Sequence, residues 1–207
     1  MPYLVTDQKD QSWRGVQWGP NISHEETNPN HYFGVYKDLN TALFMYPYHE
    51  DITEPKFWSI SESSDPKQYR SEIPKATTLE PVSVHLPTNE QRINFAILTC
   101  LFLISNKTFR DWAKAYLLGE QADDPITVGN KLKESITVDG NPTQDDYFSC
   151  AHACLNSVMV ENPNFFVAAS AHRAFCDSPE NDPIDLAQIA TIALSVSRKD
   201  IAQMILN

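Results

Sequence analysis

The most suggestive chemical pattern in the sequence is a set of cysteine and histidine residues in the last third of the chain. Cys150 and Cys154 are one helical turn apart, and so are His172 and Cys176. Two antiparallel helices can bring four such side chains together as a Cys3His set, which tetrahedral zinc accepts. Structural zinc sites more commonly hold closely spaced cysteines on turns, and small cysteines also pack well between alanine-rich helices. We therefore expect a packed core of reduced thiols without a metal, and zinc is the alternative.

A second group combines histidines with carboxylates in the first third of the chain, in segments expected to be loops. Imidazole and carboxylate groups can transfer protons or hold a metal ion. Their spacing matches no ligand motif, so solvated loop residues are the main interpretation. The group consists of His24, Glu25, Glu26, His31, His49, Glu50 and Asp51.

No motif of the common enzyme classes is present in the sequence. There is no phosphate-binding P-loop, no Gly-x-Gly-x-x-Gly, no Gly-x-Ser-x-Gly and no His-Glu-x-x-His. A phosphate-cradling loop is also hard to build from only six glycines. We therefore favour a non-catalytic function and leave enzymatic activity open.

The chain is acidic, and its formal net charge of −11 is unevenly spread. Residues 1–86 carry 12 acids and 7 bases, residues 87–119 carry 2 and 4, and residues 120–207 carry 13 and 5. This balance opposes direct binding to nucleic acid, which requires basic side chains that neutralise phosphates. An acidic surface can serve solubility alone, or it can dock on a basic partner.

The acids that we assign to a docking surface lie in the last third of the chain. Many fall at expected helix starts, where a carboxylate also caps the helix and favours its macrodipole. Capping explains individual positions, but it does not explain why so few bases offset the acids. The assigned residues are Asp123, Asp124, Asp139, Asp145, Asp146, Asp177, Glu180, Asp182 and Asp185.

The helix expected to organise the fold covers residues 88–105. Apolar residues occupy nearly all of its faces, so it must be buried on several sides. Thr88 can cap its start, with Gln91 in the capping-box position. A second helix is expected from Thr108 to Leu118, ending at Gly119. The two form an αα-hairpin in this prediction.

Three more helices are expected in the last third, each opened by an Asn or Asp followed by proline. They cover Thr143 to Val160, Asn164 to Phe175 and Ile184 to Leu206, and residues 128–136 are a further candidate. Alanine is frequent on their apolar faces, which lets helix axes approach closely. Residues 87–207 therefore predict a bundle of about five to six helices.

Residues 1–86 are expected to form a strand-rich region. Candidate strands lie at 3–6, 13–18, 32–36, 56–61 and 80–86, with a short helix at 41–46 that Pro47 ends. The fold class is therefore α+β. It comprises a mixed α/β region over 1–86 and an all-α bundle over 87–207, and we expect one core to join them through the helix at 88–105.

Parts of the first 85 residues resemble known domains. Three runs resemble an uncharacterised domain found in phage and bacterial genomes. They are Arg14 to Trp18, Phe33 to Tyr36 with the helix that follows, and Phe57 to Ile60. That domain has no catalytic signature to transfer. The resemblance therefore implies a phage or bacterial origin and no particular chemistry.

Two further resemblances imply other functions. Residues 34–36 and the helix after them are similar to a strand and helix of ADP-ribosyltransferases, a family that uses an arginine or histidine together with a glutamate. Arg14 and Glu62 are the loosely placed candidates for those two roles. The alanine-rich helices of the last third resemble those of small bacterial immunity-type proteins.

These observations predict a non-catalytic acidic interaction protein. We expect a phage- or mobile-element-encoded inhibitor that binds and blocks a basic, nucleic-acid-handling host or defence protein, without a cofactor, nucleic-acid contact or membrane contact. A cytoplasmic location is expected because no basic-then-apolar leader and no lipidation motif is recognised. A degenerate ADP-ribosyltransferase-like enzyme and a zinc-stabilised helical immunity-type protein are the alternatives. The oligomeric state is left open.

Overall fold

The computed structural model describes the chain apart from Trp13, Pro29, Asp51, residues 62–67, 140–142 and 180–182, and Asn207. It describes no side chains for residues 136–139, 143–147 and 206. The chain divides into two compact units, Met1–Leu86 and Pro87–Asn207. A β-sheet and one helix form the first unit and helices form the second, which confirms the α+β fold class.

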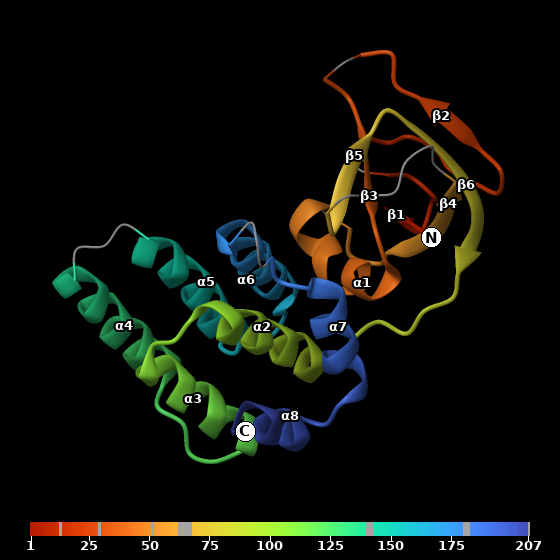
Figure 1. Ribbon diagram of the computed structural model, residues 1–207. Helices are drawn as coiled ribbons and strands as arrows, with labels where there is room; N and C mark the ends of the chain where they lie inside the picture. The colour runs from red at the N-terminus through yellow and green to blue at the C-terminus, as the bar shows by residue number, and fades with distance from the viewer. Residues whose placement is uncertain are drawn as a thin grey trace. The chain divides into compact units, whose positions relative to one another are not determined.

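The N-terminal unit is built on a six-stranded antiparallel sheet with the strand order β2-β6-β4-β1-β3-β5 (Figure 1). One helix, α1, joins β3 to β4. The elements are β1 (Tyr3–Thr6), β2 (Ser23–Glu25), β3 (Phe33–Tyr36), α1 (Leu39–His49), β4 (Lys56–Ser61), β5 (Arg70–Ile73) and β6 (Lys75–Val82).

The sheet curls back on itself because β5 and β6 are almost one strand. Only Pro74 separates them, yet β5 pairs with β3 at one edge while β6 pairs with β4 and β2. The Pro74 carbonyl accepts a hydrogen bond from the Glu26 backbone N–H at 2.8 Å, which ties the bend to the end of β2. Leu4, Trp18, Phe33, Val35, Ile60, Ile73 and Ala76 fill the interior.

Several sequence-based boundaries in this unit need correction. The described part of the expected strand at 13–18, residues 14–18, forms no strand: an isolated bridge joins Gln11 to Gln17, and Trp18 lies in the core. Helix α1 continues through Pro47 to His49, and the Glu50 backbone N–H donates to the Tyr46 carbonyl at its end. The strands β2 and β5 were not predicted, and of the expected strand at 80–86 only residues 80–82 are strand, at the end of β6.

The C-terminal unit contains seven helices within the described residues, one more than the upper limit predicted. The sequence pattern joins the last two, but Ser197 starts a new helix there: its hydroxyl oxygen accepts the Asp200 N–H at 3.3 Å. The helices are α2 (Asn89–Leu103), α3 (Lys107–Leu118), α4 (Pro125–Asp139), α5 (Thr143–Ser157), α6 (Asn164–Asp177), α7 (Leu186–Ser195) and α8 (Arg198–Leu206).

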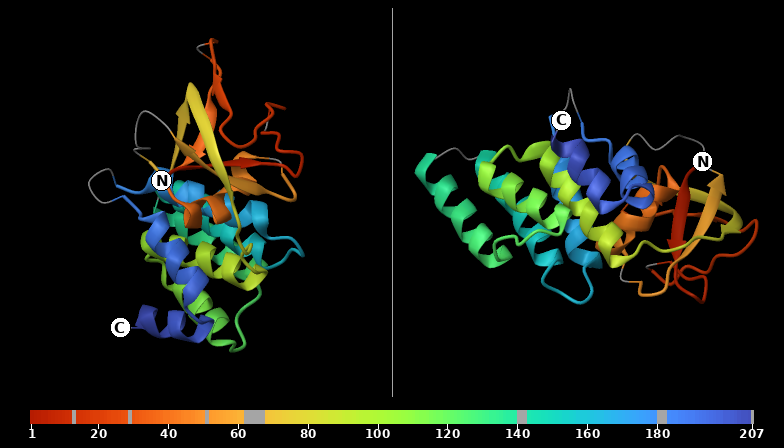
Figure 2. Two further views of the ribbon diagram at one scale, coloured as in Figure 1. Left: turned by 90° about the vertical axis from the view of Figure 1, so that its right-hand side faces the viewer. Right: turned by 90° about the horizontal axis from the view of Figure 1, so that it is seen from below.

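Helix α2 is the centre of this unit, as its apolar sequence predicts. It packs against α5, α6 and α7 (Figure 2), and its buried residues include Phe95, Ile97 and Cys100. The capping box is present: the Thr88 hydroxyl accepts the Gln91 N–H at 3.2 Å, and the Gln91 side chain accepts the Thr88 N–H at 2.9 Å. The expected shared core between the two units stays a prediction. In the part of the chain that the structure describes, no helix combines the length and apolar character that crossing a membrane requires.

Candidate functional site

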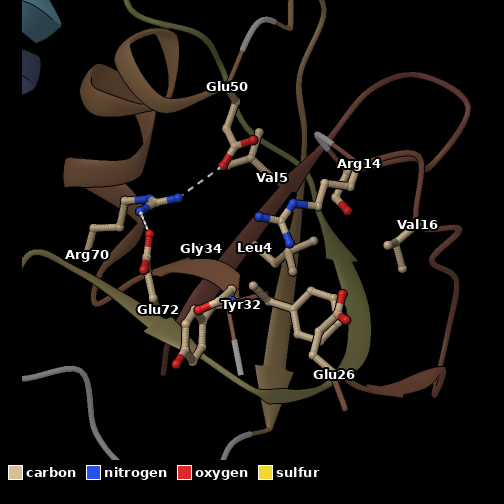
Figure 3. Close-up of a pocket in the computed structure, with 13 residues that line it drawn as sticks. Leu4, Val5, Arg14, Val16, Glu26, Tyr32, Gly34, Glu50, Arg70 and Glu72 are labelled. Carbon is tan, nitrogen blue, oxygen red and sulfur yellow. Dashed lines mark hydrogen bonds and ion pairs between the residues drawn. The ribbon is translucent and has the colours of Figure 1, made fainter. Parts of the chain in front are cut away.

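A charged pocket of about 120 Å³ lies within the N-terminal unit. Its volume is comparable to that of an engineered protein cavity of about 150 Å³ that binds benzene, so the pocket has room for one side chain or one small ring. Two arginines and three glutamates line it, together with Tyr32 and Gly34 (Figure 3). The charged residues are Arg14, Glu26, Glu50, Arg70 and Glu72.

Strand pairing places one wall of the pocket. Gly34 on β3 lies opposite Glu72 on β5, two residues from Arg70. A Cβ atom at position 34 would overlap the Arg70 guanidinium group, so the absence of a side chain at Gly34 leaves the space that this group occupies. The register of an edge strand thus brings a glycine and a half-buried arginine together.

Glu50 follows the C-terminus of α1, where its backbone N–H donates to the Tyr46 carbonyl at 2.8 Å. Its side chain is only 8% exposed and lies 3.5 Å from Arg70 Nη2. Burial raises the pKa of the Glu50 carboxyl to about 7, and the nearby Arg70 guanidinium only partly opposes this shift. Glu50 is therefore a carboxyl group that changes charge near neutral pH.

Arg70 is shared between two carboxylates. Its Nη1 lies 3.5 Å from Glu72 and its Nη2 lies 3.5 Å from Glu50, both longer than the roughly 2.8 Å of a strong charge-assisted hydrogen bond. Its Nε atom is buried and has no hydrogen-bond partner among the described residues. The pocket thus contains a guanidinium group whose pairing is incomplete.

The structure divides the histidine–carboxylate group of the sequence analysis. Glu26 and Glu50 line the pocket, and His31 lies 3.7 Å from Glu26 at the pocket's edge. His24 instead packs edge-on against Trp18, and His49 hydrogen-bonds to the Tyr69 hydroxyl at 2.9 Å. Glu25 pairs with Lys75 at 2.8 Å on the surface, and Asp51 lies outside the described residues.

One of the two residues that the transferase resemblance suggests is in the pocket. Arg14 reaches into it from the side opposite Arg70 (Figure 3). Glu62 lies outside the described residues, so the predicted pair stays a prediction. Spacing did not indicate Arg70 and Glu72, since their places depend on an edge strand that the sequence pattern did not reveal.

The four residues of the zinc hypothesis are not assembled into one site. Cys150 contacts Cys100 on α2, with 2.9 Å between the two sulfur atoms, while His172 Nε2 lies 3.6 Å from Cys176 on α6 itself. No group of three or more His, Cys, Asp or Glu residues suited to a metal exists among the described residues. Cys176 is exposed, so the expectation of a packed core that includes its thiol is wrong.

Asp123, Asp124 and Asp185, three of the assigned acids, have local partners that the structure shows directly. Asp124 and Asp185 cap α4 and α7, accepting the backbone N–H of Thr127 and of Gln188, each at 3.0 Å. Asp123 pairs with Lys131 at 2.8 Å. Asp177 is half-buried at the end of α6. The structure does not describe Glu180 and Asp182, or the side chains of Asp139, Asp145 and Asp146.

Two assigned acids belong to a larger exposed feature, which we call the acidic loop. It comprises Glu120, Asp123 and Asp124 in the connection between α3 and α4, with Ile126 in the first turn of α4. All four are exposed, and Ile126 is 60% accessible despite being a large apolar residue. Glu120 and Ile126 were not assigned to the docking surface from the sequence, although an acid-rich run followed by Pro-Ile is visible there.

Comparisons with protein-family models, curated proteins and solved structures gave no match to the chain.

Proposed function

We propose that the protein is a non-catalytic binding module that docks on a basic partner protein, and that the acidic loop forms part of the contact. A partner with a basic surface for nucleic acid would present its positive charge to these carboxylates. Docking there would exclude the nucleic acid, so the protein would act as an inhibitor of its partner.

The acidic loop is the observation that carries the proposal. It concentrates three exposed carboxylates within five residues and places an exposed isoleucine directly beside them. Protein interfaces combine an apolar anchor with a polar rim, and Ile126 with its neighbouring acids has that composition. Asp124 keeps its negative charge while it caps α4, so its structural role and a binding role are compatible.

Affinity capture with two matched variants tests the proposal. The loop variant Glu120→Gln, Asp123→Asn, Asp124→Asn removes three charges and keeps a capping side chain at position 124. The control variant Glu90→Gln, Glu134→Gln, Glu161→Gln removes three exposed charges elsewhere in the same unit. Both variants and the wild-type protein are used as bait in nuclease-treated lysate at low and at high salt.

We expect the wild-type and control baits to recover the same basic protein, which the loop variant loses at least tenfold. Its recovery should fall as salt rises, since salt screens exposed charge pairs. Equal recovery by all three baits would contradict the role of the acidic loop. Absence of any enriched basic protein from the wild-type capture would contradict the proposed function as a whole.

An enzymatic function is the second candidate, and the pKa of Glu50 favours it. A carboxyl group that titrates near pH 7 beside Arg14 and Arg70 has the properties of a general acid or base. Incubation with nicotinamide adenine dinucleotide directly tests whether the protein is an ADP-ribosyltransferase. Nicotinamide release by the wild-type protein, lost in Glu50→Gln, would support catalysis, and no release above the buffer rate would remove this candidate.

A further inference from the structure

The function proposed for the acidic loop does not use the charged pocket of the N-terminal unit. We infer that this pocket is a binding site for a cationic side chain, the guanidinium of an arginine or the ammonium of a lysine. Two sources can supply that chemistry: a free amino acid, or a side chain presented by a bound polypeptide. The site is separate from the acidic loop and can be tested independently of it.

The charges that line the pocket leave a deficit of positive charge. Three glutamates face two arginines, so the pocket carries one excess negative charge when all five groups are ionised. Arg70 divides its two contacts between Glu50 and Glu72, which leaves neither carboxylate fully paired. A bound cation would balance this excess negative charge.

The burial of Glu50 means that this excess negative charge destabilises the protein when no ligand is bound. Its carboxyl group is 8% exposed, so water compensates little of its charge. The raised pKa of Glu50 agrees, because burial outweighs the attraction of Arg70. A ligand cation beside Glu50 would add a second cationic partner to Arg70 and favour the ionised carboxylate.

The shape and walls of the pocket fit the same ligand. Tyr32 is 40% exposed and presents an aromatic ring at the pocket (Figure 3), and aromatic faces attract guanidinium and ammonium groups. A volume of about 120 Å³ accommodates the head and part of the stem of one long side chain.

The binding should depend on pH through Glu50. The charged or titratable groups around it and around the pocket are Arg14, Glu26, His31, Tyr36, His49, Tyr69, Arg70 and Glu72. Burial raises the pKa of Tyr36 well above its ordinary value of 10.0, so this hydroxyl stays neutral across the range of interest. If the cation binds only the ionised form of Glu50, its affinity should be about thirtyfold higher at pH 8 than at pH 5.5.

Nuclear magnetic resonance titration of the full-length, ¹⁵N-labelled protein tests the inference. The probe is Nα-acetyl-L-arginine methylamide, whose only charge is the guanidinium group. The matched control is the corresponding citrulline derivative, which has nearly the same shape and no charge. The reporter is the amide signal of Gly34, because this residue lines the pocket.

We expect the arginine probe to shift the Gly34 signal in a saturable, pH-dependent manner, while the citrulline probe leaves it unchanged. The variant Glu50→Gln should remove the pH dependence. Glu26→Gln, at the more accessible rim, should weaken binding about fivefold without disturbing the fold. No shift with the arginine probe, an equal shift with citrulline, or binding that does not vary with pH would each overturn the inference.

Two further experiments are needed. One distinguishes a free amino acid from a polypeptide as the source of the cation, and the other distinguishes binding at the pocket from binding at the acidic loop. A capped Gly-Gly-Arg-Gly-Gly peptide that binds at least tenfold more tightly than the arginine probe identifies a polypeptide ligand. Equal affinities of the peptide and the arginine probe show that a single side chain is sufficient for binding. The loop variant Glu120→Gln, Asp123→Asn, Asp124→Asn should titrate like the wild-type protein, so the pocket and the acidic loop can fail separately.

Discussion

Gly34 and Arg70 show how one small residue determines the shape of the pocket. The Arg70 guanidinium occupies the space that a Cβ atom at position 34 would fill. The substitution Gly34→Ala should displace this group and leave the buried Glu50 without its partner. We expect a loss of about 1–3 kcal/mol in the free energy of unfolding, measured by urea denaturation.

Gly129→Ala is the matched control for that experiment. Gly129 lies within α4, and an added Cβ atom would meet only Leu155 Cδ1 at an ordinary contact distance of 3.7 Å. Because alanine favours a helix over glycine, this variant should gain about 0.5–1 kcal/mol. Losses of similar size in both variants would show that glycine replacement, and not the Arg70 contact, is the cause.

Glu50 should impose a recognisable pH dependence on stability. Its pKa rises from 4.5 to about 7 on folding, so between these values the native state holds more protons than the unfolded chain. The free energy of unfolding contributed by this group therefore falls as pH rises through that window, by about 3 kcal/mol between pH 4 and pH 8.

The variant Glu50→Gln isolates this contribution. Its stability relative to the wild-type protein should rise by the same amount from pH 4 to pH 8, as measured by denaturation at several pH values. Glu72→Gln, which alters an exposed partner of Arg70, should keep the wild-type profile. A stability difference between Glu50→Gln and the wild-type protein that stays constant with pH would contradict the burial of an ionisable Glu50.

At the residue scale, the sequence indicated part of the pocket but not its arrangement. Glu26 and Glu50 belonged to the histidine–carboxylate group, and Arg14 was indicated by the transferase resemblance. Arg70 joins them only because β5 pairs with β3 in a register that sets Gly34 opposite Glu72. Such a contact depends on strand pairing between distant segments, which residue spacing does not reveal.

At the scale of elements, helix ends were more predictable than strands because their signals are local. The Thr88 capping box and the left-handed Gly119 are formed by residues a few positions apart. Strand β2 has the polar sequence Ser-His-Glu, and only its pairing with β6 makes it a strand. A period-two apolar pattern is absent there, so β2 could not be predicted.

Thr88 provides the test at this scale. Thr88→Ala should remove the capping box of α2 and cost about 1 kcal/mol in the free energy of unfolding. Thr88→Ser keeps a hydroxyl that can accept the Gln91 N–H, and it should retain most of the stability. Thermal or urea denaturation of both variants measures the difference, and equal losses in the two would exclude the hydroxyl as the stabilising group.

At the scale of the whole molecule, the chain combines two units that offer different chemistry. The N-terminal unit encloses a pocket with three carboxylates and two guanidinium groups, and the helical unit exposes acids and an isoleucine at the acidic loop. The net charge of −11 suits a basic partner for both. The division at residues 86 and 87 coincides with the change from strand-rich to helical patterning in the sequence.

The measurement that tests the central claim most directly is the recovery of a basic partner by the loop variant relative to the three-charge control variant. Both baits carry the same net charge, so only the location of the removed carboxylates differs. The proposed function predicts a recovery ratio of one-tenth or less, together with release of the partner as salt rises. A ratio near one would contradict the claim that the acidic loop binds the partner.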